Sequence, residues 1–379
     1  MKLTDICDFQ GGSQPPKEEW SFDKQDGYVR MLQIRDFTQS ERVTPEYIKI
    51  SNSTKVCEAD DILIARYGAS IGKILTGLAG AYNVAIMRTI PDTSKIKKKY
   101  LYYYLKSSYF QNAIINVGSR AAQAGFNKED LSKLDIECPK LVEQEGVINI
   151  LEKIEAVIEK QKEELTSLDD LIKARFVEMF GDENNSRNWN VVNVEEVADV
   201  QVGVVIKPSQ YYTDESNGVK AFRSLNIGAG FIKDIDWAYF TKEGHLKNSK
   251  SILKENDLLI VRSGAPGTAC VVTEEFAGCN AVDVIIAHLD CEKVNPYYLC
   301  TFTNMPHGKK QINEGTGGAA QQHFNVGKYN KLRLMLPPKM LQDEFAVFIQ
   351  QVNKSKVAVQ KALDETQLLF NSLMQEYFG

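Results

Sequence analysis

The acidic, cysteine and histidine side chains of this 379-residue chain lack the spacings that catalysis and metal binding need. A metal-dependent nuclease uses an acidic residue two positions before a lysine, and no aspartate or glutamate here is followed by lysine at that distance. Phosphate-binding loops, dinucleotide-binding loops, nucleophile elbows and the HExxH zinc motif are also missing. The seven cysteines form no CxxC pair and the four histidines lie far apart. We therefore expect free thiols, no catalytic residue, no cofactor and no metal in this chain.

One segment, Asn295-Pro296-Tyr297-Tyr298, is similar to the Asn/Asp-Pro-Pro-Tyr motif with which amino-methyltransferases hold adenine. It lacks the second proline, and no glycine-rich methyl-donor loop accompanies it. Proline suits the first turn of a helix. We expect this segment to begin a helix instead.

Arginines at two points of the chain have the chemistry to contact DNA. Arg66 and Arg262 each follow a short apolar run and come shortly before a glycine. A guanidinium that projects from a tight loop can bind guanine with two hydrogen bonds. The alternative is a structural arginine that ties the turn to a carboxylate, or one that contacts phosphate. The same arginine occurs at both points, whereas residues that read two different base sequences should differ. The structural or phosphate role is therefore favoured.

Two loops combine small residues with polar side chains that can reach base edges. They are residues 118–127 and 315–325. Small residues let a backbone approach DNA closely, and glutamine can bind adenine; a plain surface loop is the alternative. A lysine cluster at 95–99 suits phosphate, although such clusters are usually solvated. The predicted DNA-binding residues are Arg66, Ser70, Lys73, Arg120, Gln123, Arg262, Ser263, Gln321, Gln322 and His323.

The elements that must position these residues occur twice in the sequence. Lys133–Pro139 (KLDIECP) aligns with Lys331–Pro337 (KLRLMLP) at an offset of 198, and the same offset pairs Phe126 with Phe324. The run DILIARYG beginning at Asp61 matches DLLIVRSG at an offset of 196. The sequence therefore predicts one unit of about 190 residues that has been duplicated. Each copy mixes short strands with glycine-rich loops and one helical stretch, residues 100–117 in the first copy.

Each copy ends in a long helix with a heptad repeat of apolar residues. Apolar positions in 141–180 and in 339–379 recur at alternating intervals of three and four, and the two sets coincide at the offset of 198. Both helices close on Phe-Gly, and glycine suits the left-handed residue that ends a helix. The main seam residues are Leu151, Ile154, Ile158, Leu165, Leu168, Ile172, Ile349, Val352, Val359, Leu363 and Phe370.

These patterns predict an α+β chain: two mixed α/β recognition domains, related by duplication and separated by two long antiparallel coiled-coil helices. The expected order is domain 1–140, helix and linker 141–188, domain 189–338 and helix 339–379. A helix of about 39 residues is roughly 58 Å long, which is more than one domain needs. The alternative is that each helix belongs only to the core of its own domain, but a two-position seam is narrow for that.

The charge distribution limits how strongly the chain alone can bind DNA. The net charge is −5, and residues 141–188 hold 12 acidic against 6 basic side chains. Residues 1–140 carry a net charge of +3. Partners are therefore expected to supply much of the phosphate contact. No apolar run of 18 residues and no signal peptide occur, so we expect a cytoplasmic chain without a membrane span.

The duplicated Asp-hydrophobic₃-x-Arg-x-Gly and Lys-Leu-x₄-Pro motifs, with helices that end in Phe-Gly, resemble the specificity subunit of type I restriction–modification systems. The resemblance covers essentially the whole chain. It implies two target-recognition domains that each read half of a split site in double-stranded DNA, with the helices fixing the gap. It also implies two methyltransferase subunits that bind S-adenosylmethionine, and two restriction/translocase subunits that use ATP and Mg²⁺.

Members of this family often carry a further helical segment before the first domain, whereas this chain enters the domain almost at residue 1. Whether the helices complete a pseudo-twofold ring therefore stays open. Two other classes of protein are weighed against this reading. A stand-alone DNA methyltransferase or nuclease is disfavoured by the missing motifs. A coiled-coil adaptor that does not bind DNA is disfavoured because most residues lie in two loop-rich domains.

Overall fold

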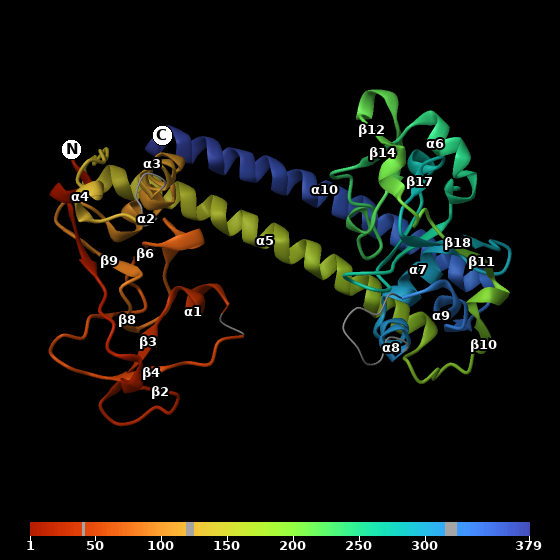
Figure 1. Cartoon of the computed structure of the whole chain (residues 1–379), viewed down its shortest axis with the longest axis horizontal. Helices are drawn as coiled ribbons and strands as arrows, with labels where there is room; N and C mark the ends of the chain where they lie inside the picture. The colour runs from red at the N-terminus through yellow and green to blue at the C-terminus, as the bar shows by residue number, and fades with distance from the viewer. Residues whose placement is uncertain (40–41, 119–124, 315–323) are drawn as a thin grey trace. The chain divides into compact units, whose positions relative to one another are not determined.

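The computed structural model shows two compact units (Figure 1). It describes residues 1–39, 42–118, 125–314 and 324–379. The first unit contains residues 1–162 and 361–379, and the second contains residues 163–360. Each unit thus holds one copy of the repeat together with one end of each long helix. None of the described helices is apolar enough over a sufficient length to cross a membrane.

An antiparallel four-stranded sheet lies at the centre of the first unit. Its strands in spatial order are β1 (Cys7–Gly11), β9 (Ile86–Pro91), β6 (Leu63–Ala65) and β7 (Ile74–Leu75). Strand β6 is part of the predicted apolar run, and all its residues are buried. Because side chains alternate along a strand, Ile64 packs in one core cluster, and Leu63 and Ala65 pack in another.

A second sheet packs on one face of this first sheet. Its five short strands are β2 (Trp20–Ser21), β4 (Tyr47–Lys49), β3 (Tyr28–Leu32), β8 (Gly80–Tyr82) and β5 (Val56–Cys57). Leu32 and Tyr82 from this sheet share a core cluster with Leu63 and Ala65 of the first. Strands β3 and β8 pair in parallel, and helix α1 (Ile34–Thr38) follows β3.

The second unit repeats both sheets in the same strand order. The first sheet consists of β11 (Ala198–Val202), β18 (Val284–Leu289), β15 (Leu258–Val261) and β16 (Ala269–Val271). The second consists of β12 (Tyr212–Thr213), β14 (Ala238–Phe240), β13 (Val219–Phe222) and β17 (Asn280–Ala281). At the place of β5, Leu253 forms backbone hydrogen bonds with Gly278 and Cys279. The parallel pair recurs as β13 and β17. The predicted duplication is therefore confirmed in the topology.

Two elements are more extensive in the second unit than in the first. Strands β10 (Asn190–Asn193) and β19 (Arg333–Leu336) form an antiparallel pair. At the matching place the first unit has a single bridge between Lys2 and Asp135. Helix α6 (Lys242–Lys247) follows β14. The changing offset of the repeat reflects such differences in length.

Short helices follow the first sheet in both units. They are α2 (Lys98–Lys106), α3 (Ser108–Gly118) and α4 (Lys128–Leu131) in the first unit, and α7 (Pro296–Asn304), α8 (Pro306–Glu314) and α9 (Val326–Asn330) in the second. The expectation of one helical stretch over 100–117 was wrong, because Ser107 has an extended backbone with ψ 154°. Its hydroxyl accepts a hydrogen bond from the Phe110 amide at 3.3 Å and so begins α3.

The segment with the methyltransferase-like motif begins helix α7, as the sequence predicts. Pro296 is the first helical residue, and the Asn295 side chain accepts a hydrogen bond from the Tyr297 amide at 2.9 Å. Asparagine here caps the helix and satisfies an amide that the helix itself leaves without a partner.

Helices α5 (Leu141–Phe180) and α10 (Lys339–Phe378) are each 40 residues long, or about 60 Å. Every predicted seam residue is buried or half-buried, whereas its neighbours along the helix are mostly exposed. In the first unit the start of α5 shares a core cluster with the end of α10, and in the second unit the end of α5 shares one with the start of α10. The helices therefore pair antiparallel, and the predicted fold class is confirmed.

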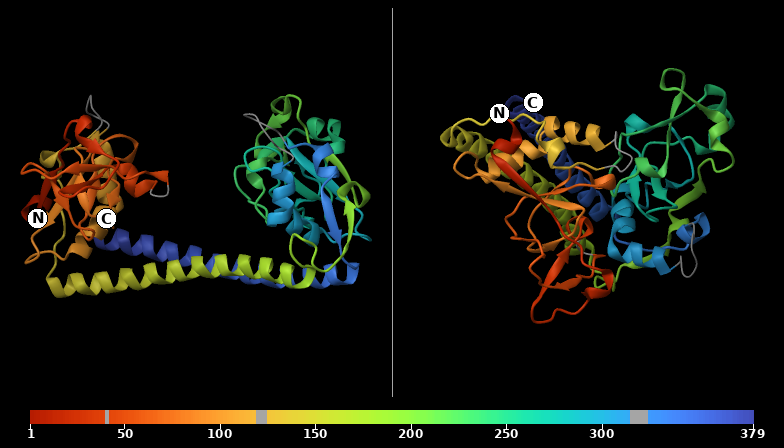
Figure 2. Two further views of the ribbon diagram at one scale, coloured as in Figure 1. Left: turned by 90° about the horizontal axis from the view of Figure 1, so that it is seen from below. Right: turned by 60° about the vertical axis from the view of Figure 1, so that its left-hand side comes forward.

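Each unit's core includes the end of the helix that follows the other repeat in sequence. The Tyr100 ring lies 5.0 Å from that of Phe378, and the Tyr298 ring lies 4.7 Å from that of Phe180. In each unit the short helices lie between the first sheet and the long helices (Figure 2). Gly181 has φ +88°, the left-handed conformation predicted for the end of α5. The Phe-Gly ends thus anchor the helices in the two domains.

Candidate nucleic-acid interface

Arg66 holds three loops together at one end of the first sheet. It follows β6 directly, its Nε donates to the carbonyl oxygen of Phe126 at 3.3 Å, and its Nη1 donates to that of Val84 at 3.3 Å. The same Nη1 lies close to Gly11 at the end of β1. The loop after β6, the turn between β8 and β9 and the end of the 118–127 loop therefore meet at one guanidinium.

Arg262 makes the equivalent contacts in the second unit. Its Nε donates to the carbonyl oxygen of Phe324 at 3.2 Å, and its Nη1 forms an ion pair with the carboxylate of Asp283. The Arg262 side chain is only 15% exposed. Since Phe324 corresponds to Phe126, both arginines fix the same loop by the same nitrogen. These contacts favour the structural role over direct base reading for both residues.

The loops that leave these arginines turn on glycines and pass through open space. Gly68 has φ +72° and Gly264 has φ +86°, and a Cβ at either position would meet no atom within 4 Å. Both conformations suit glycine, which lacks the Cβ that makes positive φ costly. Each loop then returns to the framework at a second glycine, Gly72 or Gly267, which lies against Ile114 or Ile312 respectively.

A side chain from the following helix supports each loop from behind. In the first unit the Gln111 Nε2 donates to the carbonyl oxygen of Gly72 at 2.9 Å. In the second unit the Lys309 Nζ donates to the carbonyl oxygen of Pro266 at 3.2 Å and to the Thr268 hydroxyl at 3.3 Å. Burial lowers the pKa of Lys309. Sequence reasoning missed both residues, although the offset of 198 pairs them directly.

The predicted residues that the structure describes lie on or beside these two loops. Ser70 is half-buried and Lys73 is exposed in the loop between β6 and β7, and Ser263 is half-buried in the loop between β15 and β16. Arg120, Gln123, Gln321, Gln322 and His323 lie outside the described residues. The residue that follows each of these segments lies against the loop: Tyr67 forms a β-bridge with Gly125, and the Phe324 amide donates to the Arg262 carbonyl at 3.1 Å.

The two loops differ in the residues that they expose. Tyr67 in the first unit is 39% exposed, and the second unit has the smaller Ser263 at that place. The loop is one residue longer in the first unit, and its Lys73 corresponds to Thr268. A shared framework thus carries different side chains, which is the arrangement expected where two domains read different sequences.

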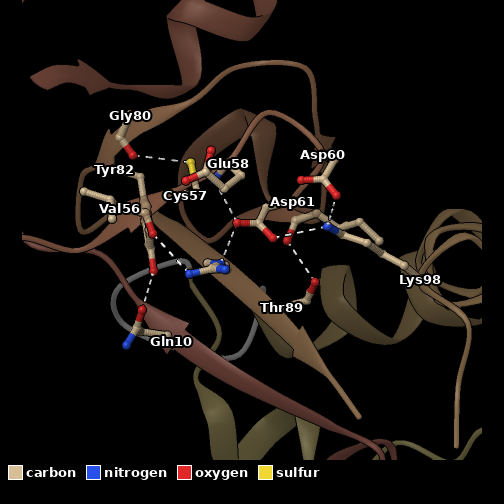
Figure 3. Close-up of polar contacts among 12 residues, drawn as sticks. Gln10, Val56, Cys57, Glu58, Asp60, Asp61, Gly80, Tyr82, Thr89 and Lys98 are labelled. Carbon is tan, nitrogen blue, oxygen red and sulfur yellow. Dashed lines mark hydrogen bonds and ion pairs between the residues drawn. The ribbon is translucent and has the colours of Figure 1, made fainter. Parts of the chain in front are cut away.

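A buried carboxylate anchors the start of each central strand, and sequence reasoning did not assign it a role. Asp61 accepts a hydrogen bond from the Glu58 amide at 2.9 Å and lies between the Arg88 guanidinium at 2.8 Å and Lys98 at 3.3 Å (Figure 3). Asp257 accepts from the Lys254 amide at 2.7 Å and lies 2.7 Å from the imidazole of His288. This shared anchoring role explains why both copies of the motif begin with aspartate.

The lysine cluster at 95–99 is matched by carboxylates of the same unit. Lys97 lies 2.6 Å from Glu145, and Lys98 lies 2.9 Å from Asp60. Lys99 lies 3.5 Å from Glu152. Because these charges are balanced locally, the contacts favour the solvated surface over a phosphate site. Among the described residues, no three His, Cys, Asp or Glu side chains gather in a way that could hold a metal ion.

The fold and the loops define a protein with two copies of one sheet framework, each presenting different loop residues. The chain belongs to the type I restriction modification DNA specificity domain family, whose model matches residues 1–167 and 186–366. The predicted recognition as a type I specificity subunit is confirmed by this match. Membership also supports the prediction that the chain is a non-catalytic subunit.

A curated relative and two solved structures agree with this assignment. The type I restriction enzyme MjaVIII specificity subunit of Methanocaldococcus jannaschii is 25% identical over 236 residues, which are 58% of this chain and 53% of that protein. The chain thus matches about half the length of this relative. The S subunit of a type I restriction–modification system from M. genitalium has a TM-score of 0.54 at 14% identity, covering 100% of this chain and 95% of that one.

A second similar structure comes from work on complex assembly and conformational transition of the type I R-M system. It has a TM-score of 0.58 at 16% identity and covers 100% of this chain and 96% of the other. At these identities the two structures show a shared fold.

Proposed function

We propose that this chain is the specificity subunit of a type I restriction–modification complex, in which each domain reads one half of a bipartite site in double-stranded DNA. The observation that carries this proposal is the pair of loops held by Arg66 and Arg262, which share a framework but differ in exposed residues. Base-edge contacts are local, and each good bidentate contact contributes about 1–3 kcal/mol of discrimination. Two such loops on one chain therefore supply two independent readings.

The long helices are proposed to set the unread gap and to carry the partner subunits. Their outer surfaces support a docking role, because apolar residues outside the seam are exposed. Leu369 in the first unit and Leu171 in the second, which correspond at the offset of 198, are 51% and 47% exposed. Two equivalent surfaces suit two copies of one partner. The proposed partners are two methyltransferase subunits that bind S-adenosylmethionine and two restriction/translocase subunits that use ATP and Mg²⁺.

A domain exchange tests the proposed division of reading. Residues 1–140 are replaced by the first domain of another family member, and the methylated sequence is determined by methylome sequencing. Only one half-site is expected to change, because residues 189–338 and their contacts stay intact. A change in both halves would contradict independent reading. The purified chain alone, incubated with DNA and methyl donor, is the control and should transfer no methyl groups.

An insertion tests the proposed role of the helices. One heptad is added to α5 and one to α10 at positions 198 apart, which keeps the seams matched. The helices should lengthen by about 10 Å, which corresponds to ~3 base pairs. Both half-sites should persist with a wider gap. An insertion that altered base identity and left the gap unchanged would overturn the spacer proposal.

A further inference from the structure

A cavity of about 480 Å³ lies beside the long helices in the second unit. It is bounded by the ends of α5 and α10, by helices α7 and α8, and by the turn at residues 229–231. Its walls combine apolar and cationic groups, including Ile172, Phe231, Ile349, Asn353, Lys309 and Lys356. This volume is within the range of sites that bind small molecules.

The first unit shows what the same place holds when it is filled. At the position equivalent to Thr301, helix α2 has Tyr103, whose side chain is fully buried. The Tyr103 hydroxyl donates to the Glu155 carboxylate at 2.7 Å, and its ring meets that of Phe370 edge to face at 6.4 Å. The phenol ring is therefore an integral part of the packing between α2 and the long helices.

The residues around Tyr103 all have counterparts in the walls of the cavity. At the offset of 198, Glu155 corresponds to Asn353 and Leu151 to Ile349, while Phe370 corresponds to Ile172. Thr301 itself also lines the cavity. Replacing a buried tyrosine by threonine removes an aromatic ring from a close-packed core, and rigid surroundings collapse only partly around such a loss. The missing phenol ring thus accounts for the part of the cavity around Thr301.

We propose that this cavity is a binding site for a small phenolic molecule, whose ring takes the place that Tyr103 takes in the first unit. Ile172 and Ile349 offer apolar contact to the ring, and the Asn353 amide can hydrogen bond with the hydroxyl. Sites of this size that combine apolar walls with a few polar groups are the usual binding sites of small molecules.

Cationic and aromatic groups at the edge of the cavity offer further contacts that favour an aromatic ligand. The Lys356 ammonium lies 5.7 Å from the centre of the Phe231 ring and 2.6 Å from Asp169. Phe231 is half exposed and offers a second ring for aromatic contact. A lysine near a bound ring favours its π face. This inference goes beyond the proposed DNA reading and does not depend on it.

Binding of p-cresol, which is the tyrosine side chain as a free molecule, tests the proposal on the full chain. Ligand-detected NMR and calorimetry should give a Kd on the order of 1 mM, as expected for so few atoms. Thr301→Tyr should abolish this binding, because the new ring fills the cavity as Tyr103 does. Thr301→Val has nearly the same volume as the native residue and should keep the binding. Cyclohexanol, which lacks the aromatic ring, should bind at least about tenfold more weakly.

The reciprocal change sharpens the test. Tyr103→Thr should create a second site for p-cresol in the first unit, so that the number of bound molecules rises from one to two. If this variant does not fold, Thr301→Tyr remains decisive, since the first unit shows that the framework accommodates tyrosine. Absence of p-cresol binding by the native chain, or binding that survives Thr301→Tyr, would overturn the proposal.

Discussion

The two units use the same framework but stabilise it with different side chains. Within the described residues, the hydrogen bonds of Arg66 go to backbone carbonyl oxygens, whereas Arg262 also pairs with the carboxylate of Asp283. The loop support is a neutral amide in the first unit and a lysine in the second. The arginine is the same in both units and its partners differ, whereas the loop support occupies one position and differs in charge. The comparison indicates that the fold needs a donor at a given point in space, while its charge is free to change.

Buried polar groups distinguish the units more strongly. All four histidines of the chain are in the second unit, and none is in the first. His307 is 7% exposed, and its ring lies 4.7 Å from that of Phe302 and 5.6 Å from that of Phe176. Within the part of the chain that the structure describes, its Nε2 has no hydrogen-bond partner. The second unit therefore contains a histidine in its core, and the first unit has no histidine.

The largest expected effect comes from the aromatic anchors of the long helices. Phe180→Ala should destabilise the second unit by about 3–5 kcal/mol, because a fully buried ring is removed from a packed cluster. Phe378→Ala should cost the first unit less, since Phe378 is 7% exposed. Hydrogen exchange measured by mass spectrometry resolves the two units. Equal losses of protection in both units for either variant would show that the anchors do not act locally.

The loop arginines come next in expected magnitude. Arg262→Met should lower the stability of its loop by about 1–3 kcal/mol, because an ion pair and a hydrogen bond are lost. Arg66→Met removes the two hydrogen bonds to the Phe126 and Val84 carbonyl oxygens and should cost about 1 kcal/mol. Each variant should increase amide exchange in its own loop and weaken recognition of its own half-site. Should Arg66→Met prove the more damaging, the contribution of Asp283 would be wrongly assigned.

A pH titration should reveal a smaller difference in stability between the two units. Burial lowers the pKa of His307 below its usual 6.5, against the opposing effect of the Glu183 and Asp182 carboxylates. The unfolded chain then binds the proton more readily than the folded chain below pH 6.5. Stability of the second unit is therefore complete above pH 6.5 and falls as pH drops below it, by at most about 1.4 kcal/mol per pH unit.

Hydrogen exchange between pH 7 and 5.5, corrected for the intrinsic rate, measures this difference, and the first unit serves as an internal reference. His307→Phe keeps the aromatic packing and should remove the pH dependence. If the dependence persists in that variant, another group is responsible.

Regular patterns in the sequence were sufficient to predict the large features of the fold. The heptad seam is a local pattern, and the offset of 198 is found by comparing the chain with itself. Both are confirmed, by burial and by topology respectively. The strand pairing could not be predicted, because β6 has three residues and because β1 pairs with β9 far along the chain, Cys7 opposite Pro91. The same holds for the site. Sequence placed Arg66 in a tight loop, but its partner Phe126 lies 60 residues away and is brought close only by tertiary packing.

The substitution with the smallest expected effect replaces the loop donor of the second unit by that of the first. Lys309→Gln gives the second unit the residue that the first unit uses at position 111, so the Pro266 carbonyl should keep a donor. The change should alter stability by less than about 1 kcal/mol, because a hydrogen bond to a neutral donor contributes a similar amount and the cost of burying a charge is removed. Lys309→Met removes the donor altogether and should expose the loop to faster amide exchange and looser half-site reading. Methylome sequencing of both variants checks the outcome. If glutamine and methionine behave alike, the donor does not position the loop, and the aliphatic part of the side chain alone would account for its place in the core.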